Sequence, residues 1–305
     1  MTMGQPEVQI LMATYNGAAY IGEQIGSLQA QTFSNWKLLI HDDGSTDGTL
    51  AVIAGFCAKD SRIQVLNDGV KTGGAAANFL HLLRYTESDI VMLCDQDDIW
   101  LPEKISTMLI ELGTIDGPAL VYANAYYLNN EQVVKRLVTR LHPTTLTDFL
   151  FINAGIQGCS MMMNRSLILQ LRSIPQTVAM HDHLLTLIAV CFGRVRYVDA
   201  VLMLYRQHGE NVTAHDVNRW KQLKKWFFTT KGVIDRTHYA ATYAFYSQYR
   251  DQLSSAQQRI LEEYFKFVNS SSVVQRIRII WRNRFSLGGH QVPLLLKTLL
   301  RKAII

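Results

Sequence analysis

The first 120 residues alternate between short apolar runs and stretches with helical spacing, and this alternation constrains the fold more than any other feature. Strand-like runs occur at 8–14, 36–42, 63–67, 89–95 and 118–124, with helix-like segments between them. Strands that alternate with helices form a mostly parallel sheet covered on both faces. The sequence therefore predicts an α/β fold with a Rossmann-like, mostly parallel sheet.

The composition is that of a folded globular chain. Its 305 residues are 48% hydrophobic and 18% charged, which disfavours disorder. The four cysteines are far apart and form no C-x-x-C pair, which argues against structural zinc and disulfides and fits a reducing cytoplasm. The N-terminus lacks a basic stretch followed by an apolar core, and no apolar run is long enough for a bilayer, so we expect neither a secretory signal nor a membrane span.

Charge is distributed unevenly along the chain. Residues 219–305 hold 16 Lys and Arg against 4 Asp and Glu, a net charge of +12. Residues 1–218 hold 14 basic and 21 acidic residues, a net charge of −7. Two regions of opposite charge predict two different roles. A nucleic-acid partner is not expected, because the acidic first two-thirds would repel a phosphate backbone.

Polar clusters follow three of the predicted strands. "TYNG" ends the first strand, "DDGSTD" ends the second and "DQDD" ends the fourth. The carboxyl ends of parallel strands meet at one edge of the sheet, where open α/β sheets bind their ligands. Three such clusters at one edge indicate a binding site rather than three solvated turns.

The "DDGSTDG" stretch vaguely resembles a calcium loop, but the position of its closing bidentate Glu is Ala54, so that interpretation fails. Asp47 is suited to cap the following helix. Asp42 and Asp43, at the strand tip, are better placed to accept hydrogen bonds from a base or a ribose. No Walker or dinucleotide glycine motif is present.

In "DQDD", Asp95 and Asp97 flank one residue, so an extended backbone lets both carboxylates point the same way. Two such carboxylates suit Mg²⁺ or Mn²⁺ rather than zinc. The alternative is a helix cap, with Asp98 ahead of Pro102, and the role of Asp98 stays open. In "MHDHLL", Asp182 has the same alternative as a helix cap.

The order "ATYNG", "DDGSTDGT", "DQDD", "HD" and "RQHGEN" resembles the inverting family 2 glycosyltransferases of GT-A fold, in particular the rhamnosyltransferase-like enzymes of bacterial O-antigen and surface polysaccharide synthesis. The resemblance covers roughly residues 7–212. It implies a GT-A catalytic domain at 1–216, with a nucleotide-sugar half at about 1–100 and an acceptor half at about 101–216. The basic residues 217–305 then form a C-terminal helical region.

The resemblance also implies roles for the matching residues. Asp95 and Asp97 would form a D-x-D pair for Mn²⁺ or Mg²⁺, with His208 closing the metal shell, and Asp182 would be the general base. The implied donor-nucleotide contacts are Thr14, Tyr15, Asn16, Glu23, Asp42, Asp43, Asn78, Asp95 and Gln96. The implied acceptor or sugar contacts are Asp98, Trp100, Gly158, His181 and Arg206.

The implied reaction moves a sugar from a nucleotide-diphosphate donor, dTDP-L-rhamnose first and a UDP sugar second, to a hydroxyl of a lipid-linked or lipopolysaccharide glycan. One displacement inverts the anomeric centre, because a carboxylate takes the acceptor proton as the diphosphate leaves. A nucleotidyltransferase is disfavoured, because no basic glycine-rich loop follows the first strand. An inactive membrane-associated module is disfavoured by the intact Asp97 and Asp182.

The last 35 residues hold seven basic residues and no acidic one. "VVQRIRIIWRNRF" interleaves Arg276, Arg278, Arg282 and Arg284 with apolar side chains, a pattern typical of helices that lie on anionic lipid. The alternative is a helical subdomain that packs on the core. We expect a cytoplasmic protein, peripheral on the cytoplasmic face of the inner membrane.

Overall fold

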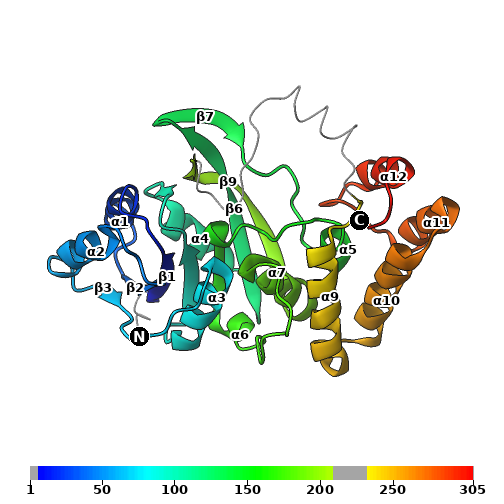
Figure 1. Ribbon diagram of the computed structural model, residues 1–305, viewed down its shortest axis with the longest axis horizontal. Helices are drawn as coiled ribbons and strands as arrows, with labels where there is room; N and C mark the ends of the chain where they lie inside the picture. The colour runs from blue at the N-terminus through cyan, green and yellow to red at the C-terminus, as the bar shows by residue number, and fades with distance from the viewer. Residues whose placement is uncertain (1–5, 209–231, 305) are drawn as a thin grey trace. The chain divides into compact units, whose positions relative to one another are not determined.

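The structure is a computed structural model that describes residues 6–208 and 232–304 (Figure 1). Internal contacts divide the chain into two units. Unit 1 comprises Met1–Arg140, Ile156–Arg172 and Phe192–Arg206, and unit 2 comprises Leu141–Gly155, Ser173–Cys191 and Gln207–Ile305. The predicted domain boundary near residue 216 lies outside the described residues and stays a prediction.

One sheet dominates unit 1. Its nine strands run in the order β3-β2-β1-β4-β8-β6-β9-β5, and β7 pairs with β6. The strands are β1 Val8–Thr14, β2 Trp36–Asp42, β3 Ile63–Val65, β4 Ile90–Cys94, β5 Ile99–Trp100, β6 Ala119–Asn129, β7 Gln132–Leu137, β8 Met161–Asn164 and β9 Arg194–Gln207.

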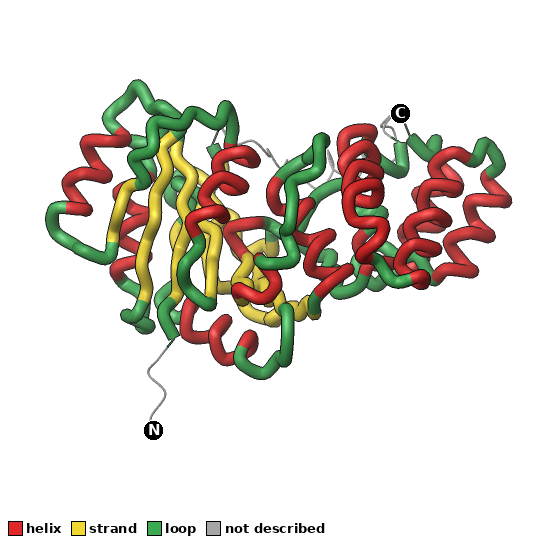
Figure 2. The backbone as a smooth tube through the Cα atoms, turned by 90° about the horizontal axis from the view of Figure 1, so that it is seen from below, coloured by secondary structure: helices red, strands yellow, loops and turns green. Residues whose placement is uncertain are grey.

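Helices flank the strands on either side, as Figure 2 shows. Those of unit 1 are α1 Ile21–Gln29, α2 Thr49–Cys57, α3 Ala75–Leu82, α4 Lys104–Leu112 and α6 Arg165–Ile168. Those of unit 2 are α5 Leu146–Phe149, α7 His181–Phe192, α9 Arg236–Tyr249, α10 Ser255–Asn269, α11 Val273–Asn283 and α12 Gln291–Leu300. Short 3₁₀ turns are η1 Leu83–Tyr85, η2 Gly158–Ser160 and η3 Arg250–Gln252.

The half of the sheet that the sequence predicts best is parallel. β1 pairs in parallel with β2 and β4, and β2 pairs in parallel with β3. Thr14 lies opposite Asp42, and Met12 lies opposite Cys94, so the three polar clusters emerge at the same edge. All seven residues of β1 are buried, which explains its continuous apolar run. The α/β fold with helices on both faces is confirmed.

The second half of the sheet is antiparallel and differs from the expectation in detail. The stretch Arg194–Gln207 forms one long strand, β9, because no turn residue interrupts it. β9 pairs antiparallel with the two-residue strand β5, which follows "DQDD" and was not predicted. Two residues are too few to show a period. This pairing carries the end of β9 past the "DQDD" turn.

Each unit has its own core. In unit 1 the apolar face of α1, formed by Ile21, Ile25 and Leu28, is fully buried with the side chains of the sheet. The core of unit 2 is aromatic, with Phe151 in edge contact with Phe267 and Phe285 at ring centroid separations of 4.9 and 5.1 Å. Across 6–208 and 232–304, no helix is both long enough and apolar enough to cross a membrane.

Candidate active site

The loop after β1 is clipped to the "DQDD" turn by a pair of hydrogen bonds. Tyr15 N donates to Gln96 Oε1, and Gln96 Nε2 donates to Tyr15 O, each at 3.0 Å. Gly17 makes room for this pair, since a Cβ there would lie 2.2 Å from Gln96 Oε1. Two of the polar clusters predicted from sequence are therefore joined directly.

The same loop is bonded to the "DDGSTDG" stretch. Thr14 Oγ1 donates to Asp42 Oδ2 at 2.8 Å, and the Asp42 carboxylate also accepts from Ser45 N and Ser45 Oγ at 2.7 and 2.6 Å. Asn16 N donates to Ser45 Oγ at 2.8 Å, and Asn16 accepts from Thr46 N at 2.8 Å. All three clusters thus form one hydrogen-bonded edge.

Asp43 is engaged by the segment that precedes α3. Its carboxylate accepts from Thr72 N and, at 3.2 and 2.8 Å, from Gly73 N and Gly74 N. Burial alone would raise the pKa of Asp43, but these backbone donors outweigh it and lower that pKa. Asp43 is therefore an ionised, fixed acceptor at the edge where the nucleotide is expected.

The carboxylates of "DQDD" are close to a thiol and an amine. One ligand atom each of Asp95, Asp98 and Cys159 lie within 4.8 Å of one another. Lys104 is fully buried, donates to Cys159 O at 2.6 Å and lies 3.7 Å from the centroid of the Trp100 ring. Asp95 and Asp98 are therefore close enough to bind one metal ion together. The predicted pairing of Asp95 with Asp97 stays a prediction.

Burial and mutual repulsion set the charges of this cluster. Burial, then the nearby charge of Asp97, raises the pKa of Asp95 to about 6. Burial, then Asp95 and Asp97, raises the pKa of Asp98 well above its usual value. Burial lowers the pKa of Lys104 to about 8. These carboxylates are destabilised as anions unless a cation joins them.

Arg206, near the end of β9, holds the "DQDD" turn in place. Its guanidinium forms ion pairs with Glu23 and Glu131 and donates from Nε to Asp97 O at 2.9 Å. Its backbone N donates to Asp98 Oδ1 at 3.1 Å. Arg206 is 4% exposed, whereas the side chains of Glu23 and Glu131 are 51% and 69% exposed, so the buried guanidinium meets its carboxylate partners at the surface.

The residues of this cluster fit a divalent cation. Asp98 Oδ2 is buried and has no hydrogen-bond partner within the part of the chain that the structure describes. Carboxylate oxygens dominate, and Lys104 and Arg206 are the basic side chains bonded here, so the cluster keeps an excess of negative charge. Mg²⁺ and Mn²⁺ prefer oxygen ligands of this kind.

The predicted base lies in unit 2, at the start of α7. Asp182 Oδ1 accepts from His183 N at 2.6 Å. Gly155 packs against this turn so closely that a Cβ would lie 2.5 Å from Asp182 C. Burial lowers the pKa of both His181 and His183 to about 3, so both imidazoles next to Asp182 are neutral at pH 7.

The remaining predicted residues are placed as follows. Asn78 is 2% exposed and bonds His41 with both ends of its amide. Trp100 is a core side chain on β5, and Gly158 begins η2, beside Cys159. His208 directly follows β9 and belongs to unit 2. The N-cap position of α4 is Glu103, whose side chain makes no capping hydrogen bond, and Asp98 lies five residues earlier, so the cap role considered for Asp98 is not observed.

Sequence reasoning missed Lys104, Cys159 and Glu131. A lone lysine behind three aspartates could have indicated a buried counter-charge at Lys104. Cys159 and Glu131 carry no local signal, because only the pairing of β8 and β6 with distant strands brings them here.

A negative site at the carboxyl edge of a parallel sheet, beside a loop that fixes acidic acceptors, is the arrangement of a nucleotide-sugar transferase. Glycosyl transferase family 2 matches residues 9–171, and the chain belongs to this family. The enzyme is a glycosyltransferase that uses a nucleotide sugar. Its mixed α/β architecture is the GT-A fold.

Relatives and solved structures agree with this assignment. The chain is 31% identical over 242 residues to "dTDP-rhamnosyl transferase RfbG" of Shigella flexneri, covering 71% of this chain and 80% of the relative. It is 32% identical over 162 residues to the Escherichia coli "UDP-Glc:alpha-D-GlcNAc-diphosphoundecaprenol beta-1,3-glucosyltransferase WfgD", covering 53% of this chain and 61% of that relative.

Two solved structures share the fold at low identity. S. aureus TarS in complex with UDP-GlcNAc superposes with a TM-score of 0.60 at 16% identity, covering 91% of this chain and 80% of that one. Mannosyltransferase PcManGT from Pyrobaculum calidifontis, in complex with GDP-Man and Mn²⁺, has a TM-score of 0.54 at 16% identity, covering 97% of this chain and 74% of that one.

The clip between Tyr15 and Gln96 can be tested through Gly17. Gly17→Ala displaces the flexible end of Gln96 and removes two hydrogen bonds, so we expect a roughly tenfold loss in nucleotide affinity with the fold intact. Gln96→Ala should give the same loss, and the double variant no further loss. Gly26→Ala, where a Cβ meets nothing within 4 Å, is the control. If calorimetric titration showed that the losses in nucleotide affinity of the two single variants add up in the double variant, the two residues would not act through this shared pair of hydrogen bonds.

Burial of His181 predicts a pH-dependent stability. Its pKa is about 3 in the folded chain and near 6.5 when unfolded, so the stability from the neutral ring is complete above pH 6.5 and falls with pH below that. Relative to His181→Leu, the wild type should lose about 1.4 kcal/mol per pH unit between pH 6 and pH 4. Urea unfolding at several pH values measures this, with the exposed His290→Leu as control. A pH-independent difference would show that burial is not the cause.

Proposed function

We propose that this enzyme transfers L-rhamnose from dTDP-L-rhamnose to a hydroxyl of a lipid-linked or lipopolysaccharide glycan, in one metal-dependent displacement with inversion. One observation carries the catalytic part of the proposal. Asp95 and Asp98 lie at the sheet edge where the loops after β1 and β2 are bonded together, and Asp98 Oδ2 lacks a hydrogen-bond partner within the described residues. A divalent cation would offset the charge of these two carboxylates, and the donor diphosphate would supply further ligands to that cation.

The donor is proposed from the relatives. The dTDP-rhamnosyl transferase RfbG covers more of this chain than the E. coli glucosyltransferase WfgD. For this reason dTDP-L-rhamnose is preferred over a UDP sugar. The acceptor class is proposed from the second of these names, which specifies a diphosphoundecaprenol-linked sugar.

Residues of unit 1 would bind and orient the donor. The Asp43 carboxylate, held by the backbone of 72–74, would accept from a base or ribose, and Asp42 would keep the neighbouring loop in shape. Asp95, Asp97 and Asp98 would hold Mn²⁺ or Mg²⁺, with His208 as a further ligand. When bound, the cation would neutralise charge on the departing diphosphate.

Asp182 would take the proton from the acceptor hydroxyl. A carboxylate can do this only while ionised and free to reach the acceptor. The neighbouring imidazoles are held neutral by burial, so they carry no competing positive charge at pH 7. Gly155 would fix the position of the carboxylate by its close approach to the helix start.

The acceptor is proposed to reach the enzyme at a lipid surface. Val292, Leu296, Leu299 and Leu300 recur at helical spacing on α12 and are 45–65% exposed. On α11, Val274, Arg278, Trp281 and Arg282 form a second exposed stripe, with Trp281 71% exposed.

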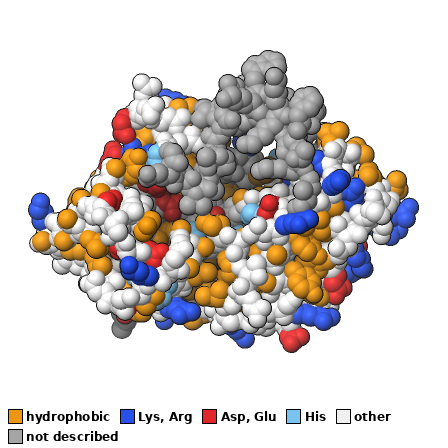
Figure 3. Space-filling view, viewed as in Figure 1, with side chains coloured by type: hydrophobic (Ala, Val, Ile, Leu, Met, Phe, Trp, Pro, Cys, Tyr) orange, Lys and Arg blue, Asp and Glu red, His pale blue; other side chains and the backbone are white. Residues whose placement is uncertain are grey.

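Apolar and basic side chains are neighbours over the part of the surface that α11 and α12 occupy (Figure 3). Arg276 and Phe285, considered part of the same pattern, are buried instead. Exposed apolar stripes flanked by arginines are suited to anionic lipid.

The donor is tested with purified protein, Mn²⁺ or Mg²⁺ and a panel of nucleotide sugars, with released nucleotide diphosphate as the readout. We expect dTDP-L-rhamnose to give the highest turnover. Faster turnover with a UDP sugar would overturn the rhamnose proposal and leave the transferase activity intact.

Asp97→Asn and Asp182→Asn should each lower turnover by roughly 10²–10⁴-fold, because each removes a charge and keeps the shape. Asp182→Asn preserves the acceptor for His183 N. The exposed Asp116→Asn is the matched control. Near-normal turnover in Asp182→Asn would assign the base to another residue.

Membrane binding is tested by sedimentation with phosphatidylglycerol and phosphatidylcholine vesicles. Arg278→Ala with Arg282→Ala should weaken binding to the anionic vesicles by about tenfold or more, at about 1 kcal/mol per basic residue. Arg250→Ala with Arg259→Ala, on exposed positions outside the stripes, is the control. An equal loss of vesicle binding in both double variants would mean that net charge alone drives binding. Unchanged binding of the Arg278 and Arg282 variant would contradict the proposed lipid-binding surface.

A further inference from the structure

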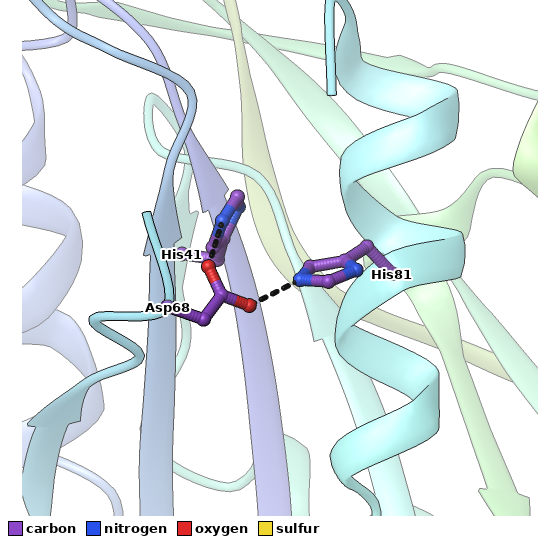
Figure 4. Close-up of side chains that lie close together, drawn as sticks. All are labelled: His41, Asp68 and His81. Carbon is purple, nitrogen blue, oxygen red and sulfur yellow. Dashed lines mark hydrogen bonds and ion pairs between the residues drawn. The ribbon is translucent and has the colours of Figure 1, made fainter. Parts of the chain in front are cut away.

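A second cluster of ligating side chains lies in unit 1, apart from the "DQDD" turn. His41 is near the end of β2, Asp68 lies in the loop after β3, and His81 is on α3 (Figure 4). His41 Nε2 lies 3.4 Å from Asp68 Oδ1, and His81 Nε2 lies 2.6 Å from Asp68 Oδ2. Their ligand atoms all lie within 4.8 Å of one another.

The hydrogen bonds of Asn78 determine which nitrogen of His41 is available. Asn78 Nδ2 donates to His41 O at 3.1 Å, so its Oδ1 faces His41 Nδ1 at 2.7 Å and accepts from it. In neutral His41 the lone pair is therefore on Nε2, directed at a carboxylate oxygen. Two acceptors facing each other repel, so the geometry calls for a cation or a proton between them.

Asp68 supplies the negative charge of the cluster. The hydrogen bond from Val70 N, then the one from His81, lowers the pKa of Asp68, so it is ionised at neutral pH. Tyr85 OH also donates to Asp68 Oδ2, at 3.1 Å. His41 is buried, whereas the side chains of Asp68 and His81 are 18% and 13% exposed, which leaves a route from solvent.

We propose that His41, Asp68 and His81 bind a divalent transition metal ion of the zinc class. Two imidazole nitrogens and one carboxylate suit such an ion and leave a fourth position for water. Metal-binding histidines usually donate a hydrogen bond from the ring nitrogen that does not bind the metal. The bond from His41 Nδ1 to Asn78 is of this kind, and it fixes both the tautomer and the orientation of the ring. The ligand set differs from the oxygen-rich "DQDD" cluster.

This inference goes beyond the proposed function and does not depend on the donor or acceptor. The ion would join β2 to α3 one residue before Asp42, and α3 begins directly after Gly74, which binds Asp43. The ion would therefore stabilise the segments that hold Asp42 and Asp43 rather than take part in sugar transfer.

The test uses the full chain and two probes, Zn²⁺ in calorimetric titration and Co²⁺ in visible absorption. Wild type should bind Zn²⁺ at this site, and Co²⁺ should give visible bands without a thiolate charge-transfer band, which separates this site from one containing Cys159. His81→Gln and Asp68→Asn should each weaken binding at least 100-fold. His290→Gln, an exposed histidine, should not.

Circular dichroism of each variant checks the fold. Asp68→Asn removes the charge with little change of shape, and its single carbonyl oxygen can still accept from one of the two donors, Val70 N and Tyr85 OH, which bond different oxygens of Asp68. If wild type shows no such Zn²⁺ binding, or if His81→Gln and Asp68→Asn bind as wild type does, the cluster is only a hydrogen-bonded network and the proposal is overturned.

Discussion

The contacts of the buried Arg206 guanidinium are the interaction on which the candidate active site depends. It pairs with Glu23 from α1 and Glu131 from the β6–β7 turn, and it holds the main chain at Asp97. A buried charge that loses its partners is costly, so these three segments are constrained together. Arg206 also donates from its backbone N to Asp98 Oδ1, so it fixes both the main chain and one carboxylate of the "DQDD" turn.

The acidic residues of this edge fall into two groups with opposite environments. Asp43 is surrounded by backbone N–H groups, which keep it ionised and fixed. Asp98 is buried and Asp95 is half-buried beside other carboxylates, which disfavours their charged form. The first environment suits recognition of a neutral base or ribose, and the second suits a divalent cation.

Much of the parallel half of the fold could be predicted from the sequence. β1, β2 and β4 are apolar runs bounded by turn residues, and their carboxyl ends meet as expected. β5 could not be predicted, because its two residues are defined by pairing with β9. Asp182 was predicted as the base from its motif and stays a prediction, whereas the close approach of Gly155 to its backbone is visible only in the folded chain.

The sequence by itself determined the fold class, the family and the chemical types gathered at the edge, because periodicity and motif spacing are local properties. Only the tertiary structure decided which groups meet. It brought Cys159 and Lys104 to the carboxylates, turned Arg276 inward and Trp281 outward, and joined His41, Asp68 and His81. These contacts depend on long-range strand pairing and on which helix face packs, and neither is encoded in the spacing of neighbouring residues.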